Sequence, residues 1–324
     1  MLLATALLII GLFLVAYGAD RLVYASAVLC RSLGIAPLVI GMTVVSLGTS
    51  LPELILSVTG ALHGQLNLAV GTALGSNIVN ILLIVGLTAV LHPFTVHSDI
   101  LRRELPLMLL VSASAGFLLF DGELSRQDGI MMLAMVVAYL WYMVSIARRA
   151  DGRNDDTLTR EQVAELPCDG SLPAAFLWLG LAIIIMPIAT HMVLDNVAAV
   201  SNALGLSDRI MGLSAIAIGT SLPELATAVA GARKGEDDIA IGNIIGANIF
   251  NLTLVPGIAA VLAPGSLDKQ VMSNDYWVML AVSVMFALLC WRRPRCIGRR
   301  VGSSLLSGFI LWMLALFITP TIFV

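Results

Sequence analysis

Charged side chains are scarce in this chain. Only 12% of its 324 residues are Asp, Glu, Lys or Arg, whereas 59% are hydrophobic and the mean hydropathy is +0.96. Soluble domains are about one-quarter charged, so the composition excludes an ordinary soluble domain and indicates a membrane protein. The sequence has no basic block and no aromatic platform, and we therefore expect no nucleic-acid partner.

Cysteine is also rare, and the motifs of several other protein classes are missing. The four cysteines are scattered, without a CxxC pair or a Cys/His cluster, so we expect neither a zinc scaffold nor a disulfide scaffold. The GxxxxGK[ST], HExxH and GxSxG motifs are absent, so we expect neither nucleotide binding nor enzymatic activity and no cofactor. The apolar segment 1–17 lacks a basic region and a cleavage site, so we interpret it as a transmembrane helix rather than a signal peptide.

Ten apolar segments are candidates for crossing a bilayer, because a membrane helix needs about 20 mostly apolar residues. We therefore expect an all-α polytopic membrane protein. The predicted spans are 2–18, 36–62, 67–91, 104–120, 128–148, 172–193, 209–231, 239–263, 275–291 and 303–322.

The basic residues alternate between the two sides of these spans. If both termini lie outside, the inner loops carry 15 Lys and Arg residues and the outer loops carry only Arg126, Arg209 and Lys269. Lys and Arg in short loops favour the cytoplasmic side. The bias supports ten spans with both termini outside the cell.

The chain divides into two five-span halves that repeat one another. The polar segment 149–171 is predicted to be a cytoplasmic linker between halves 1–148 and 172–324. Residues 41–86 align without a gap on 212–257, with 20 of 46 positions identical. Because five is an odd number of spans, the second half must be inverted in the membrane. Transporters with such inverted repeats bind their substrate near the midplane, beside broken helices.

The sequence GTSLPE occurs once in each repeat. Proline removes an amide donor and clashes with the carbonyl four residues earlier, so Pro52 and Pro223 are expected to free carbonyl oxygens for a hard cation. Hydroxyl oxygens on the same turns would add to them. These hydroxyls belong to Thr49, Ser50, Thr220 and Ser221.

Each motif ends in a glutamate, and a carboxylate inside a membrane span indicates function. We place Glu53 and Glu224 deep in spans, where no Lys or Arg lies inside the span to pair with them. If the repeats meet at the midplane, the two carboxylates converge and need neutralisation. Ca²⁺, which takes six to eight oxygen ligands, fits such a site, but two Na⁺ ions or two protons would neutralise the pair as well.

Asparagines form a second repeated element. We expect Asn80 and Asn251 to contribute to the site, while for Asn77 and Asn248 a site role and a helix-linking hydrogen bond are equally plausible. The glycines near these asparagines are expected to allow close helix packing, and they are Gly71, Gly75, Gly242 and Gly246. Histidines are read as loop, interface or span-end residues without metal-ligand spacing, and they are His63, His92, His97 and His191.

The paired G-T-S-x-P-E and G-S/A-N-x-x-N/D segments resemble the alpha-repeats of the cation/calcium antiporters, the sodium/calcium exchanger superfamily. More closely, the whole chain resembles the bacterial YrbG-like inner-membrane branch. The resemblance implies an inner-membrane antiporter that exchanges Ca²⁺ for Na⁺ by alternating access, with inorganic cations and the lipid bilayer as its partners. The cation ligands that it implies are Glu53, Glu224, Thr49, Thr220, Ser50, Ser221, Asn80 and Ser76, with backbone carbonyls of Ser46 and Ala217.

Two departures from the family pattern limit this comparison. Ala247 stands where the family often has Ser, and Asn251 stands where it often has Asp, so the ion stoichiometry does not carry over. Pro256 opposite Val85 is a further asymmetry between the repeats. The alternatives that stay open are a Ca²⁺/H⁺ antiporter, a cation channel, and an exchanger for another divalent ion.

Overall fold

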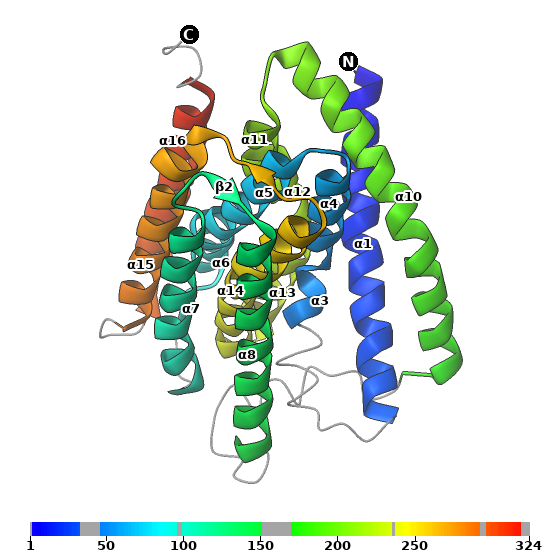
Figure 1. The fold of residues 1–324 in the computed structure, drawn as a ribbon. Coiled ribbons are helices and arrows are strands. Elements are labelled where there is room, and N and C mark those ends of the chain that lie inside the picture. The colour runs from blue at the N-terminus through cyan, green and yellow to red at the C-terminus, as the bar shows by residue number, and fades with distance from the viewer. Residues whose placement is uncertain are drawn as a thin grey trace.

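The computed structural model describes residues 2–32, 46–95, 99–150, 170–234, 237–291 and 296–318, which are almost entirely helical (Figure 1). The helices are α1 (Leu2–Ser32), α3 (Ser46–Thr49), α4 (Leu51–Leu62), α5 (Leu66–Val79), α6 (Gly86–Leu91), α7 (Asp99–Leu118), α8 (Arg126–Ala150), α10 (Leu172–Leu204), α11 (Asp208–Met211), α12 (Ala217–Thr220), α13 (Leu222–Lys234), α14 (Asp237–Leu262), α15 (Tyr276–Trp291) and α16 (Arg299–Ile318). Three π-helical segments are η2 (Asn80–Val85), η3 (Gly212–Ile216) and η4 (Val271–Asp275).

Many of these helices have the length and composition of membrane spans. Among the described residues, five helices qualify by themselves, and a sixth span results if a bent pair of helices is counted as one. Four shorter apolar helices accompany them. The expectation of a helical membrane protein is confirmed, whereas the count of ten spans stays a prediction. Residues 36–45 of the second predicted span and 151–169 of the linker lie outside the described residues.

Helices α1 and α10 form a pair along one flank of the molecule (Figure 1). They are the longest helices described, with 31 and 33 residues. Their backbones come close at Gly11, where an added Cβ would lie 2.7 Å from Val193 Cγ2. The Arg21 guanidinium lies 5.4 Å from the ring centroid of Tyr17 on α1 and 5.3 Å from that of Trp178 on α10. These contacts join the two helices into one unit.

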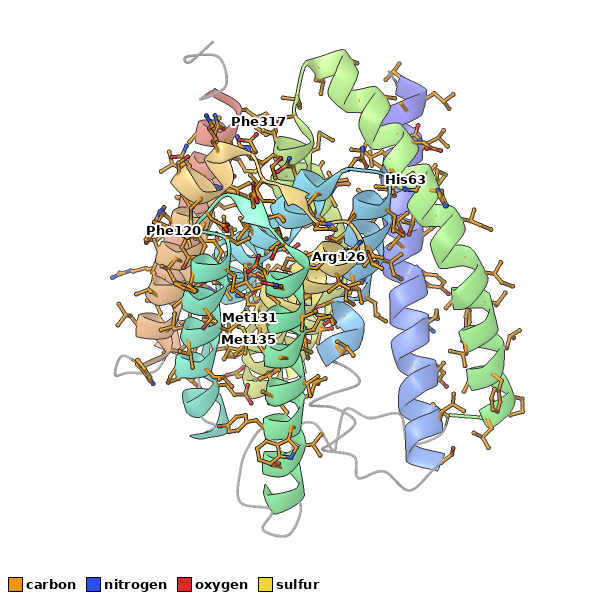
Figure 2. The ribbon with its side chains drawn as sticks, viewed as in Figure 1. His63, Phe120, Arg126, Met131, Met135 and Phe317 are labelled. Carbon is orange, nitrogen blue, oxygen red and sulfur yellow. The ribbon has the colours of Figure 1, made fainter. Side chains whose placement is uncertain are left out.

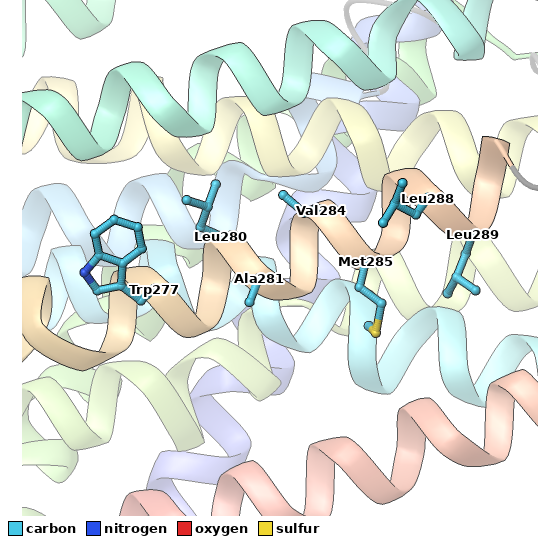
Figure 3. A pocket seen from close by; sticks show the side chains of 7 residues that line it. All are labelled: Trp277, Leu280, Ala281, Val284, Met285, Leu288 and Leu289. Atoms are coloured by element: carbon cyan, nitrogen blue, oxygen red, sulfur yellow. The ribbon is translucent and has the colours of Figure 1, made fainter.

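The centre of the molecule is built from α4, α5, α13 and α14, and α7, α8, α15 and α16 lie around it (Figure 1). Glycine allows α5 to approach the second half closely, because a Cβ on Gly75 would lie 2.7 Å from the Leu213 carbonyl oxygen. The expected role of glycines in close packing is confirmed at this position. The outer helices expose apolar side chains. On α15 such side chains line a groove of about 630 Å³, and Trp277 is 54% exposed there (Figure 3).

Both GTSLPE segments break a helix, as the prolines predict. The chain leaves helical geometry at Ser50 between α3 and α4, and at Ser221 between α12 and α13. Each proline then occupies the second position of the following helix, where its missing N–H leaves no intrahelical hydrogen bond unmade. The span containing the second break is bent by 41°. In contrast, Pro256 lies within the continuous helix α14.

Four two-residue strands connect the halves. Strand β1 (Phe94–Thr95) pairs antiparallel with β4 (Cys296–Ile297), and β2 (Glu123–Leu124) pairs with β3 (Gly265–Ser266). Each pair joins a connector of the first half to a connector of the second. The two halves are therefore tied at two places outside the helices.

Candidate cation site

The two repeat glutamates occupy equivalent positions in the first turns of their helices. Glu53 is the third residue of α4 and Glu224 is the third residue of α13, and both side chains are fully buried. The free amides of a helix N-terminus favour nearby negative charge. The broken helix therefore places each carboxylate inside the molecule, close to partly positive backbone groups.

Each carboxylate lies next to the Thr-Ser pair of the other half. Glu53 Oε1 accepts hydrogen bonds from Ser221 Oγ at 3.2 Å and from Ser76 Oγ at 3.5 Å. The Glu224 carboxylate faces Thr49 and Ser50 of the first half, and the two carboxylates are near enough to repel each other. The two halves thus meet at the glutamates.

Most of the oxygen atoms at this meeting point lack a hydrogen-bond donor. Among the described residues, Glu53 Oε2 and both carboxylate oxygens of Glu224 are buried without a hydrogen-bond partner. The same holds for Ser50 Oγ and Asn80 Oδ1, and for both amide atoms of Asn251. A buried carboxylate without a partner costs several kcal/mol. A set of unpaired anionic and neutral oxygens is the ligand set that hard cations such as Ca²⁺ and Na⁺ prefer.

Asparagine side chains join α5 and the following segment η2 of the first half to α14 of the second half. Asn77 Nδ2 donates to the Asn248 carbonyl oxygen at 3.0 Å, and Asn80 Nδ2 donates to Asn248 Oδ1 at 3.0 Å. Of the two roles that were open for Asn77 and Asn248, the structure shows the hydrogen bond between helices. Asn80 makes such a bond too, and its amide oxygen stays available. Asn251 is fully buried in α14.

Three of the predicted ligand residues have other surroundings. The Thr220 hydroxyl donates to the Ile216 carbonyl at 2.9 Å, so its proton points back along its own helix. The Ala217 carbonyl accepts the Ser221 amide at 3.2 Å and is therefore not freed by the helix break. Ser46 is the first residue of α3, and its side chain lies outside the described residues. The predicted roles of Ala217 and Ser46 as ligands stay predictions.

Asn243 on α14 was not among the predicted site residues. It is 4% exposed, and its Oδ1 accepts a hydrogen bond from Thr49 Oγ1 at 3.2 Å. Its position matches Thr72 in the first repeat. A polar residue within an otherwise apolar span is a signal that was available in the sequence. The two repeats carry different residues at this position, so the comparison of identical positions between them did not point to Asn243.

Charged side chains other than the two predicted glutamates are buried in the structure. Arg209, expected in an outer loop, is buried, and its Nη1 lies 2.6 Å from Asp275 Oδ2. Asp275 and Glu104, which begin two of the predicted spans, are buried as well. Hydropathy windows could not reveal the pair, since its partners come from α11 and η4. Arg209 Nη2 also donates to Gln270 Oε1.

Many metal sites in proteins are built from three or more His, Cys, Asp or Glu side chains. No group of three or more His, Cys, Asp or Glu side chains that could hold a metal ion occurs in the part of the chain that the structure describes. Any cation at this site would thus be held by two carboxylates with hydroxyl, amide or carbonyl oxygens. Such a neutral-rich shell suits an ion that must also be released.

Comparison with known protein families agrees with this arrangement. The family model described as sodium/calcium exchanger protein matches residues 3–145 and 174–318, which is most of the chain. The chain belongs to the sodium/calcium exchanger family. Both GTSLPE segments fall within the matched ranges. The family comprises transporters rather than enzymes, in agreement with the expectation from the sequence.

Individual relatives of this exchanger-family protein cover nearly its whole length. The inner membrane protein YrbG of Escherichia coli (strain K12) is 64% identical over 317 residues, which are 98% of each chain. The putative antiporter CaxA of Alkalimonas amylolytica is 41% identical over 319 residues, 98% of this chain and 99% of that one. The predicted resemblance to the YrbG-like branch is confirmed.

Solved structures of the sodium-calcium exchanger NCX_Mj share the fold. One obtained with Na⁺ and Sr²⁺ matches with a TM-score of 0.66 and 27% identity over 97% of this chain and 98% of that one. Another, obtained with Na⁺ and Ca²⁺, matches equally well. The exchanger-family protein thus has the NCX_Mj fold.

Proposed function

We propose that this protein is a secondary active antiporter that exchanges Ca²⁺ for Na⁺ across the bacterial inner membrane. The observation that carries the proposal is the pair of buried carboxylates, Glu53 and Glu224, of whose four oxygens three have no hydrogen-bond partner among the described residues. Ca²⁺ or Na⁺ between them would offset the repulsion. The names of the relatives, which include exchangers, a putative antiporter and an inner membrane protein, support this reading.

We infer that ten helices form two inverted five-helix repeats, 1–148 and 172–324, with the ions near the midplane, both termini periplasmic and 149–171 cytoplasmic. The reciprocal strand pairs support this symmetry: β1 and β3 are equivalent at an offset of 171 residues, and each pairs with a strand of the opposite half. The contacts of the two glutamates are reciprocal in the same way, because each glutamate lies beside the Thr-Ser pair of the opposite half.

The coupling of the two fluxes follows from charge. Ca²⁺ and Na⁺ compete for the same two carboxylates, so the loaded protein is close to neutral at the site, whereas the empty one carries two charges that would be costly to move through the membrane. In our proposal the α1/α10 pair slides along the central helices and exposes the site to one side at a time. The single body formed by α1 and α10 supports such a movement.

The test is calcium-45 uptake into proteoliposomes loaded with Na⁺ or with choline. We expect uptake only with internal Na⁺, and loss of uptake in Glu53→Gln and Glu224→Gln. Glu123→Gln, at an exposed residue of strand β2, is the matched control and should transport normally. Uptake that is indifferent to Na⁺ would contradict sodium coupling. Normal uptake by either glutamine variant would contradict the site.

A further inference from the structure

Two histidines from separate helices meet at the surface of the molecule, near the end where the N-terminus lies (Figures 1 and 2). His63 directly follows α4 and His191 lies on α10, and both side chains are exposed. Their ring centroids are 5.7 Å apart and their planes are nearly perpendicular, at 88°. This contact joins the helix that carries Glu53 to the α1/α10 pair.

The hydrogen bonding of His63 determines which ring nitrogen is available. Its Nδ1 lies 2.7 Å from the carbonyl oxygen of Thr59. Since a carbonyl only accepts hydrogen bonds, Nδ1 must carry the proton and donate it, and Nε2 then keeps a lone pair. Metal-binding histidines usually donate their second ring N–H to a carbonyl or carboxylate in this way. The backbone of α4 thus orients His63 as a metal ligand.

The distance between the rings fits one shared metal ion. Two imidazoles bound tetrahedrally to Zn²⁺ at about 2.0–2.1 Å have ring centroids about 5 Å apart. The observed centroid distance of 5.7 Å is close to this value. We propose that His63 and His191 form a site for a divalent transition-metal ion of the zinc class, with water in the remaining positions. The transported ions would avoid this site, because Ca²⁺ and Na⁺ prefer oxygen ligands.

A metal ion at this place would restrain the movement proposed above. One ligand belongs to the central helices and the other to the α1/α10 pair, so the ion would hold the two bodies at one distance. The site would therefore slow exchange without touching the carboxylates. This consequence, unlike the metal site itself, rests on the proposed antiport function.

Zinc binding is tested first, without any transport assay. Isothermal titration calorimetry with Zn²⁺ would use purified protein in the Glu53→Gln background, which weakens zinc binding at the carboxylate pair. We expect at least tenfold weaker binding when His63→Ala or His191→Ala is added, and no change with His92→Ala, an exposed histidine elsewhere. Because both site histidines are exposed, the variants should fold normally, and gel filtration checks this. Unchanged zinc affinity in both variants would overturn the site.

The restraint is tested by calcium uptake in proteoliposomes with native Glu53. Added Zn²⁺ should slow uptake by wild type and by His92→Ala, but not by His191→Ala. Equal slowing of all three would place the inhibition at another site and overturn the proposed restraint. If wild type takes up no calcium even without zinc, the proposed function fails, while the calorimetric result on the histidine site stands by itself.

Discussion

Glu224→Gln should stabilise this protein when no cation is present, although it destroys the proposed site. Both carboxylate oxygens of Glu224 are buried without a hydrogen-bond partner among the described residues, and Glu53 lies close by. The substitution keeps the shape of the side chain, removes one of two repelling charges, and adds an amide that can donate to Ser50 Oγ. A group selected for binding an ion is therefore expected to lower the stability of the ion-free protein.

The magnitude follows from the repulsion between two buried charges. Two unit charges about 4 Å apart interact by about 4 kcal/mol at an effective dielectric constant of about 20. Relaxation of the surroundings and proton uptake by one carboxyl group of the ion-free protein reduce this value, so we expect the glutamine variant to gain about 1–3 kcal/mol in the free energy of unfolding. In saturating Ca²⁺ the order should reverse, since only wild type gains the free energy of binding.

The assay is thermal unfolding of the purified protein in detergent, once with a chelator and no Na⁺ and once with Ca²⁺. In the chelator, Glu224→Gln should unfold a few degrees above wild type, and Ca²⁺ should raise the midpoint of wild type only. Glu123→Gln removes an exposed carboxylate and should shift neither midpoint. A lower midpoint for Glu224→Gln in the chelator would refute the reasoning about unpaired buried charge.

An internal comparison sharpens this prediction. Asp275→Asn is the same chemical change at another buried carboxylate, but Asp275 is paired with the buried Arg209 at 2.6 Å. Breaking such a pair leaves an uncompensated cation and typically costs about 3–5 kcal/mol. Since Asp268 Oδ2 remains 3.6 Å from Arg209 Nε, we expect destabilisation by about 3 kcal/mol, at the lower end of that range. Stabilisation by Glu224→Gln together with destabilisation by Asp275→Asn would support an unpaired carboxylate at Glu224 and a paired one at Asp275.

Two further predictions concern the contacts between the halves. Ser221→Ala removes a hydroxyl 3.2 Å from Glu53 Oε1, and we expect the Ca²⁺ concentration for half-maximal uptake to rise about tenfold, whereas Ser112→Ala, which loses only a bond to its own helix, should leave it unchanged. Gly75→Ala places a Cβ 2.7 Å from the Leu213 backbone and should lower the free energy of unfolding by about 1–3 kcal/mol. Gly180→Ala meets open space and should leave stability equal or slightly higher in the same unfolding assay.

Much of the fold could be expected from local sequence. The apolar composition indicated membrane helices, and the prolines of GTSLPE predicted the helix breaks that occur at Ser50 and Ser221. The burial of Glu53 and Glu224 also agrees with expectation. These features depend on residues close together in the chain, so a sequence pattern reports them directly. The roles of the two glutamates as cation ligands stay predictions until transport is measured.

Contacts between side chains that are far apart in the sequence could not be predicted in the same way. Arg209 was assigned to a loop because it begins an apolar segment, yet it is buried against Asp275. Asn243 was overlooked because the matching residue of the first repeat is threonine. In each case hydropathy describes the segment, but the partner that neutralises or hydrogen-bonds the side chain comes from another element.

The sequence by itself determined the membrane class, the internal repeat and the motif that places a glutamate after each helix break, since composition, identity and spacing along the chain carry this information. Only the tertiary structure decided which groups meet. It put the Ser221 hydroxyl of one half on Glu53 of the other and left the Glu224 oxygens without hydrogen-bond donors among the described residues. It also brought His63 against His191 on α10. The physical reason is that helix packing sets these neighbours, because side chains far apart along the chain become close only when the helices assemble.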